Sequence, residues 1–220
     1  MTLLSIGLFF LLPLANAPLE MLGSPLPGVR TFAMDTKARD QWPEHPFGHT
    51  SDKFTGRFGT ASFVAIAVVN TSGEIYDTEF LEKIKRITDA VDVAPNVNHY
   101  QVSSLSHINT RVIRIEPDGS LTAEMLMEEV PEDEDELVGF KELILQNPGL
   151  IYGRLVSLDH TAALVQAGFI THRLDNREAY QGLFDHMMKI KEEEEADGTA
   201  KVYISGFPMV VGWTLSLIHI

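Results

Sequence analysis

The sequence of 220 residues contains no cysteine and has far fewer basic than acidic side chains. Without cysteine the chain can form neither disulfides nor thiolate sites, and such a composition suits an oxidising compartment. There are 17 Lys and Arg against 31 Asp and Glu, which gives a formal net charge of −14. Because contacts with phosphate groups need a basic surface, this balance argues against binding to nucleic acid or to anionic lipid surfaces.

Charge is also absent from both ends of the chain. No charged side chain occurs between Met1 and Leu19, and residues 3–14 are almost wholly apolar. Three interpretations of residues 1–22 stay open: a partial first transmembrane helix, a signal segment ending in small residues, or a buried helix of a soluble protein. The uncharged run over 206–220 predicts the start of a second transmembrane helix, with Trp213 as an interfacial aromatic.

Between these ends the sequence divides into a linker and a domain. Frequent Pro and Gly predict an irregular linker over residues 23–60. Residues 61–205 predict one main domain. Its first strand, 61–69, is continuously apolar, which is typical of a central strand buried on both faces.

Strands and helices then alternate along the domain. The apolar spacing predicts a helix from Thr78 that ends before Pro95, and Asp118-Gly119 predicts the turn of a hairpin. The other expected elements are strands 97–105, Arg111–Ile115, Leu121–Met125, 151–158, 162–170 and 201–205 and helices 133–146 and 176–195.

This order predicts an α+β fold. Without the inserted hairpin and helix it is the ferredoxin-like, split-βαβ pattern, in which two helices pack on one face of an antiparallel sheet. We expect strand 61–69 at the centre of the sheet, antiparallel to 162–170 and to 201–205. Such a fold supports many functions and does not identify one.

No residue pattern predicts catalysis or a metal site. His45 and His49 are separated by Pro46 and Gly48, so a shared helical face is not expected. The remaining candidate residues are dispersed and lack ligand spacing or the strand–turn–helix setting of a nucleophile; they are His99, His107, His160, His172, the run Asp159–Thr161 and the pair Ser103 and Ser104. We therefore expect a protein that is not an enzyme and needs no metal or other cofactor.

Two acidic runs have structural interpretations. The block 128–136 lacks the spacing of a calcium loop and predicts the solvated start of a helix, where carboxylates are favoured. The run 192–195 consists of four Glu near a helix end, where negative charge is unfavourable, so fraying of that end is expected.

Several segments carry a family resemblance in their order along the chain. The apolar start, the linker containing Trp42-Pro-Glu-His-Pro-Phe, and Phe58-Gly59 before the buried strand resemble the first periplasmic loop of RND-superfamily exporters, particularly the hydrophobe-exporter and MMPL-like branch. Further similar segments begin at Gly73, Ile87, Pro95, Val102 and Asn147, and the passage from Gly206 to Trp213 is similar to the family's start of the second membrane helix.

This resemblance implies a proton-driven exporter of lipids or other hydrophobic or amphiphilic compounds in the bacterial inner membrane. Its ferredoxin-like porter domain lies on the periplasmic side and receives cargo. The implied partners are the bilayer, the cargo, the remainder of the transporter and further copies in a homo-oligomer, but no nucleic acid. Family proton relays use ionisable residues inside membrane helices, and this sequence has none there. The chain is therefore expected to supply the cargo-facing part, and the sequence assigns no cargo-binding residue.

A different class of function fits the same pattern. A secreted or membrane-tethered α+β binding domain would carry the same core without transport activity. Separately, residues 215–220 resemble the translation of an adapter used in sequencing libraries, which predicts that the natural sequence ends near Thr214.

Overall fold

The computed structural model describes residues 44–217, except 59–61, 116–117, 171–172 and 175–176. All described residues belong to one unit, Lys37–Ile220. The segment 1–22, expected to be a membrane helix or a signal, and most of the linker 23–60 lie outside the described residues.

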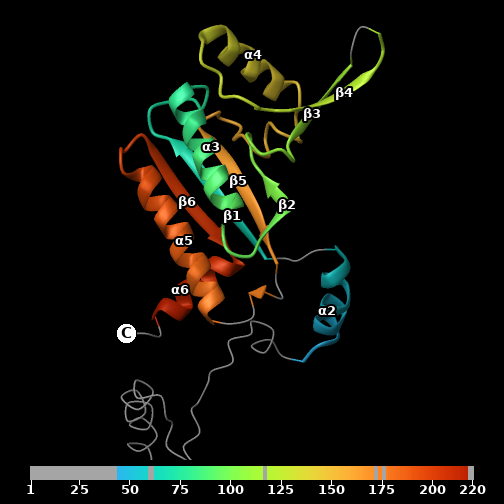
Figure 1. The fold of residues 1–220 in the computed structure, drawn as a ribbon, viewed down its shortest axis with the longest axis vertical. Coiled ribbons are helices and arrows are strands. Elements are labelled where there is room, and N and C mark those ends of the chain that lie inside the picture. The colour runs from blue at the N-terminus through green and yellow to red at the C-terminus, as the bar shows by residue number, and fades with distance from the viewer. Residues whose placement is uncertain (1–43, 59–61, 116–117, 171–172, 175–176, 218–220) are drawn as a thin grey trace, which may run out of the picture. The chain divides into compact units, whose positions relative to one another are not determined.

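An antiparallel sheet of four strands forms the centre of an α+β fold (Figure 1). Its strand order is β2-β5-β1-β6, and the strands are β1 Phe63–Asn70, β2 Val97–Ser103, β5 Ala162–Phe169 and β6 Ala200–Gly206. On β1, Ile66 lies opposite Val165 of β5 and Ile204 of β6. The predicted central position of this strand, antiparallel to both neighbours, is confirmed.

Helices α3 (Thr78–Asp92) and α5 (Arg177–Glu195) cover one face of the sheet (Figure 1). The start of α3 is fixed by Asp77, whose side chain accepts a hydrogen bond from Phe80 N at 3.1 Å. Apolar residues at helical spacing on both helices meet the inward side chains of the strands. The core they form includes Val64, Ile66, Val68, Leu81, Ile84, Ile87, Val91, Val165, Leu183, Met187 and Val202.

The expectation that β1 is buried on both faces is wrong. Val64, Ile66 and Val68 are fully buried, but the alternate positions are partly exposed and Phe63 keeps 44% of its surface. The apolar run therefore conceals a two-residue alternation, because small alanines at 65 and 67 form the other face. We call this second side, opposite α3 and α5, the open face of the sheet.

The connection from β2 to β5 carries the predicted insertions. Strands β3 (Arg111–Ile115) and β4 (Leu121–Met125) form a separate antiparallel hairpin, and α4 spans Glu134–Leu145. Asp133 caps α4 by accepting from Glu136 N at 2.8 Å. The hairpin and helix predicted from the sequence are confirmed.

Two local predictions are wrong. Residues 151–158 form turns with isolated bridges instead of a strand, since Gly149 and Gly153 have positive φ angles of 77° and 83° that turn the chain. Part of the expected irregular linker is helical, because α2 spans Pro46–Phe58. Proline suits the first position of a helix, because the backbone N–H that it lacks would have no partner within the helix at this position.

The expected fraying of residues 192–195 is also wrong, since α5 extends to Glu195. Cations from α3 neutralise this end: Arg86 binds Glu194 through two hydrogen bonds of 3.1 and 3.0 Å. Lys83, only 2% exposed, donates to Glu194 O at 3.1 Å and pairs with Asp197. This pairing holds the pKa of Asp197 well below its usual range, chiefly through the Lys83 hydrogen bond.

Replacing Lys83 by Met should lower the melting temperature of the chain by roughly 2–4 °C. Methionine is similar in length but apolar, so Asp197 would lose its cation. The resulting loss of stability is limited because the Asp197 carboxylate retains 47% exposure to water. Circular dichroism measures the shift. The control is Lys85→Gln on the exposed side of the same helix, and a shift of equal size in this control would contradict the role given to Lys83.

Helix α6 (Phe207–Leu217) follows β6 directly. Within the described part of the chain, no helix combines the length and the apolar character that crossing a membrane requires. Met209 and Leu215 of α6 are buried, at 6% and 4% exposure. In this structure α6 packs against α5, β1 and β6.

Candidate functional site

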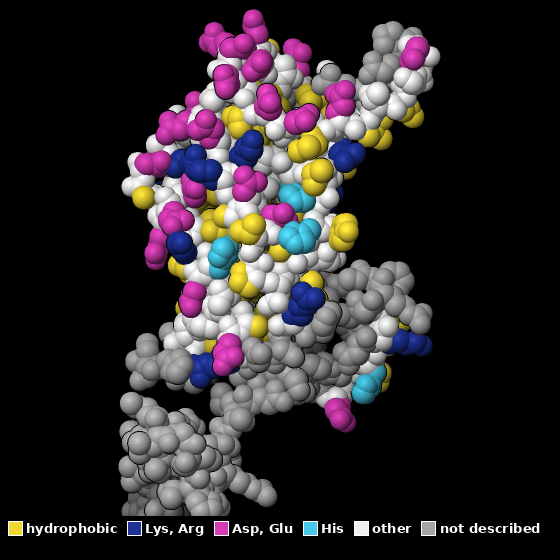
Figure 2. Space-filling model, in the orientation of Figure 1, with side chains coloured by type: hydrophobic (Ala, Val, Ile, Leu, Met, Phe, Trp, Pro, Cys, Tyr) yellow, Lys and Arg dark blue, Asp and Glu magenta, His cyan; other side chains and the backbone are white. Residues whose placement is uncertain are grey.

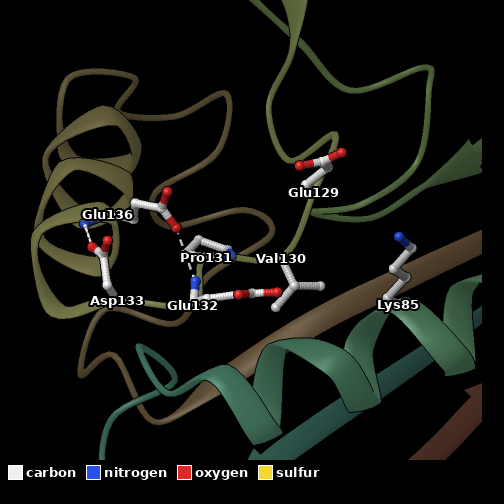
Figure 3. Close-up of a pocket in the computed structure, with 7 residues that line it drawn as sticks. All are labelled: Lys85, Glu129, Val130, Pro131, Glu132, Asp133 and Glu136. Carbon is white, nitrogen blue, oxygen red and sulfur yellow. Dashed lines mark hydrogen bonds between the residues drawn. The ribbon is translucent and has the colours of Figure 1, made fainter.

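An acidic cleft lies between α3 and the segment that leads into α4. It has a volume of about 870 Å³ and is lined by Lys85, Glu129, Val130, Pro131, Glu132, Asp133 and Glu136. Figure 3 shows the Lys85 side chain on α3, on the opposite side of the cleft from the start of α4. Figure 2 shows acidic side chains gathered over α4 and the part of the molecule next to it.

Two of these carboxylates are already used to begin the helix. Asp133 accepts from Glu136 N, and Glu136 Oε2 accepts from Glu132 N at 2.9 Å (Figure 3). Such contacts satisfy backbone donors that a helix start leaves open. The acidic block is thus a solvated helix start, as the sequence predicted, and the described ranges contain no group of three side chains able to hold a metal ion.

A second hollow is apolar, and we call it the α6 groove. Its volume is about 450 Å³, within the usual range of ligand pockets. Helices α5 and α6 and strand β6 form its walls, with Phe184, Met188, Lys191, Val202, Tyr203, Ile204, Ser205, Gly206, Met209, Val210 and Trp213. Tyr203, Val210 and Trp213 are 58%, 58% and 56% exposed, so this is an apolar surface that water reaches.

Close packing between helices sets one wall of the α6 groove. A Cβ at Gly212 would lie 2.6 Å from Phe184 Cβ and 3.0 Å from Tyr180 O. Glycine therefore allows α6 to approach α5 more closely than any other residue would. The approach leaves the side chains of Val210 and Trp213 beside those of α5 and β6.

The α6 groove has one cation in its lining. Lys191 Nζ donates to Glu195 Oε1 at 2.7 Å and to Val202 O at 2.5 Å. Glu195 Oε1 also accepts from Val202 N at 2.7 Å. The Lys191 hydrogen bond, with that backbone hydrogen bond, lowers the pKa of Glu195 below its ordinary value. The ammonium and carboxylate are thus paired with each other, and the groove offers mainly apolar contact.

The structure does not assemble a catalytic triad from the candidate residues. Asp159 Oδ1 accepts from Ser157 Oγ at 2.6 Å and from Thr161, and these contacts lower the pKa of Asp159 to about 2. His160 instead meets Tyr76, with Nδ1 2.7 Å from the tyrosine oxygen. Ser104 is buried and accepts from Thr88 Oγ1 at 2.8 Å. Each of these described groups therefore has a different structural partner, and they do not form a Ser–His–Asp triad among themselves.

The tyrosine beside His160 has a strongly perturbed acidity. Burial, the largest cause, and nearby Glu74 raise the pKa of Tyr76 to about 12. Tyr152 stacks on the His160 ring with centroids 5.0 Å apart. His160 itself has a φ of 60°, which is uncommon outside glycine.

Two other candidate histidines meet at one carboxylate. His99 Nδ1 is 2.9 Å and His107 Nε2 is 3.4 Å from Asp92 Oδ1. Sequence reasoning missed this contact, because the three residues lie at the end of a helix, in a strand and in a loop.

The remaining histidine candidates show no shared site. His45 Nδ1 accepts from Phe47 N at 3.2 Å, and His49 lies within α2. His172 lies outside the described residues.

The α6 groove was not predicted from the sequence either. The sequence indicated α5, β6 and an apolar C-terminal run, and it assigned Trp213 to a membrane interface. The packing of α6 against α5 was not predicted. The signal that could have indicated it is Gly212 in the apolar run, because small residues are typical of places where two helices approach closely.

Comparison with known proteins adds no assignment to this geometry. No protein-family model matches the chain. A search of curated proteins also finds no match.

Proposed function

We propose that this chain is the cargo-facing periplasmic domain of a proton-driven RND-type exporter of lipids or other amphiphiles, with a ferredoxin-like core. The element order β1-α3-β2-β5-α5-β6 supports this fold. In the sheet order β2-β5-β1-β6, one strand of each strand–helix–strand unit lies between the two strands of the other unit, and this order also supports the proposed split-βαβ core.

The observation that carries the proposal is the α6 groove. Its water-accessible walls are largely apolar, and its volume of about 450 Å³ can accept the chain of an amphiphile. Met209, Val210 and Trp213, which line the groove, belong to the segment whose sequence resembles the start of a membrane helix. An amphiphile leaving a bilayer would meet this surface with little exposure of its tail to water.

Binding to the groove can be measured through Trp213. The chain has two tryptophans, so Trp42→Phe leaves Trp213 as the fluorescent one. With this variant in uncharged maltoside detergent, added brominated dodecyl maltoside should quench Trp213. Val210→Glu should weaken the quenching, since a carboxylate in the groove would repel the alkyl chain. Val138→Glu on α4, at an equally exposed valine (57%), is the matched control.

Transport decides between the exporter and the tethered binding domain. The complete open reading frame is expressed in bacterial cells that lack their own RND exporters, and the cells are loaded with the lipophilic dye Nile red. We expect further apolar segments downstream, dye efflux that a protonophore stops, and slower efflux in Val210→Glu. A reading frame that ends soon after α6, or dye retention equal to that of empty cells, would exclude the exporter and leave the binding domain.

A further inference from the structure

A third hollow lies on the open face of the sheet, at the β2 edge. Its volume is about 310 Å³. It is lined by residues of β1, β2 and β5, by residues 109–111 at the start of β3, and by the turns around 150–155. Because β2 and β6 are opposite edges of the sheet, this pocket is separate from the α6 groove. We call it the arginine pocket.

The arginine pocket is basic in a strongly acidic protein. Arg111 and Arg154 line it, and its lining contains no Asp or Glu. Arg111 Nε donates to Ile108 O at 3.2 Å, which orients the guanidinium and leaves its other nitrogens available. Among the described residues, neither arginine pairs with a carboxylate. Two unneutralised guanidinium groups in one hollow suit an anion, which arginine binds through paired hydrogen bonds.

A buried hydroxyl in the same lining also lacks a partner. Thr110 lines the pocket and is only 8% exposed. Its Oγ1 is one of two buried side-chain atoms without a hydrogen-bond partner in the described part of the chain. Leaving such a group unsatisfied is costly, and an oxygen-rich ligand would provide the missing acceptor.

The backbone shapes the pocket at an irregularity of β2. The pairing of β2 with β5 shifts between Asn98 and Ser103. Gly168 of β5 makes room for Gln101, whose Oε1 would lie 2.2 Å from a Cβ at that position. Asn109 holds the adjoining loop by donating to His99 O at 2.7 Å and Val102 O at 2.9 Å. Bulges of this kind re-aim side chains and are common beside binding sites.

Apolar side chains complete the arginine pocket. Phe63, Leu150 and Tyr100 line it and are 44%, 52% and 91% exposed. The ring of Tyr100 is nearly bare, although aromatic side chains gain free energy from burial. Apolar walls beside two arginines match a ligand that is both anionic and apolar.

We propose that the arginine pocket binds the anionic head group of a small amphiphile. Arg111 and Arg154 pair with its charged oxygens, Thr110 donates to it, and Phe63, Tyr100 and Leu150 cover the first part of its tail. The net charge of −14 does not oppose this binding, because the acidic side chains are absent from the lining and solvent screens more distant ones.

Titration calorimetry of the full chain in uncharged maltoside detergent tests the proposal. The probes are hexyl phosphate, hexanoate, inorganic phosphate and hexanol, each corrected with protein-free micelles. Hexyl phosphate or hexanoate should bind, and which of them binds more tightly identifies the head group as phosphate or carboxylate. Inorganic phosphate and hexanol should bind at least tenfold more weakly, since each lacks one half of the recognised chemistry.

Variants separate recognition from structure. Arg154→Gln should weaken binding of the preferred anion about tenfold, and Arg111→Gln combined with it should abolish binding. Thr110→Val should weaken binding about threefold without lowering the melting temperature, because the hydroxyl has no partner in the free protein. Lys85→Gln removes one positive charge from the acidic cleft and should leave binding unchanged.

Several results would overturn the proposal. These are no binding of either amphiphilic anion, equal binding of hexanol, equal binding of inorganic phosphate, or unchanged affinity in Arg154→Gln. An unchanged affinity in Thr110→Val contradicts the assigned donor. The arginine pocket shares no residue with the α6 groove. A failure of the calorimetric test therefore does not contradict the exporter proposal. Retention of Nile red by the cells, in turn, does not contradict anion binding in the arginine pocket.

Discussion

Replacing Ile66 by Asp is expected to leave the chain without a folded domain. Ile66 is fully buried at the centre of β1, between Val165 of β5 and Ile204 of β6. Its partners on both neighbouring strands are apolar, so a carboxylate at this position would be buried without a charged partner from the sheet. Burying an unpaired carboxylate costs several kcal/mol, which is comparable to the roughly 5–15 kcal/mol that stabilise a whole domain. Circular dichroism should show loss of the cooperative thermal transition.

Ala67→Asp is the matched control for this change. Ala67 is the next residue along β1, but it lies on the open face and is partly exposed. Water can solvate a carboxylate there, so the expected cost is only about 1–2 kcal/mol and the transition should persist. If Ile66→Asp melts within a degree or two of the unchanged chain, β1 does not occupy the centre of the sheet.

The elements of this fold were predictable where local physical chemistry determines them. The apolar run of β1, the cap at Asp133 and the turn at Gly119 each act within a few residues of sequence. One failure comes from contacts distant in sequence. The four Glu of 192–195 at a helix end predicted fraying, because the sequence does not show that Lys83 and Arg86 lie beside them. These cations come about a hundred residues earlier in the chain and neutralise this helix end.

The wrong strand at 151–158 has a different cause. Ile151, Leu155 and Val156 are buried, so the apolar pattern correctly reported their contact with the core. Burial does not require extended backbone, and Gly153 turns the chain between them. Ser157 N donates to Ala162 O and Leu164 N to Leu155 O, which gives a short pairing with β5 in place of a full strand.

Neither hollow proposed as a site could be derived from sequence. The α6 groove needs Phe184, Tyr203 and Trp213 from three elements. The arginine pocket needs Arg111 from the start of β3 and Arg154 from the turns between α4 and β5. Each residue alone is an ordinary exposed side chain. Their chemistry becomes a site because the sheet order places their elements together, and no spacing in the sequence encodes that order.

The second large effect is expected at Gly206, where β6 passes into α6. Its φ is 139°, in the region that favours glycine, and a Cβ there would lie 2.1 Å from Phe63 O and 3.0 Å from Val64 Cα. Gly206→Ala must therefore push β6 from β1 or change the direction of α6. We expect a loss of roughly 3–5 kcal/mol in the free energy of unfolding, measured by urea titration.

Gly198→Ala separates strain from close approach. Gly198 has a similarly positive φ of 75°, but no atom lies within 4 Å of a Cβ at that position. Its expected cost is about 1 kcal/mol, from backbone strain alone. Equal losses in the two variants would mean that contact with β1 contributes nothing. If Gly206→Ala is the more costly variant, brominated dodecyl maltoside should also quench Trp213 less in it. Displacement of α6 would change the wall of the groove that binds the alkyl chain.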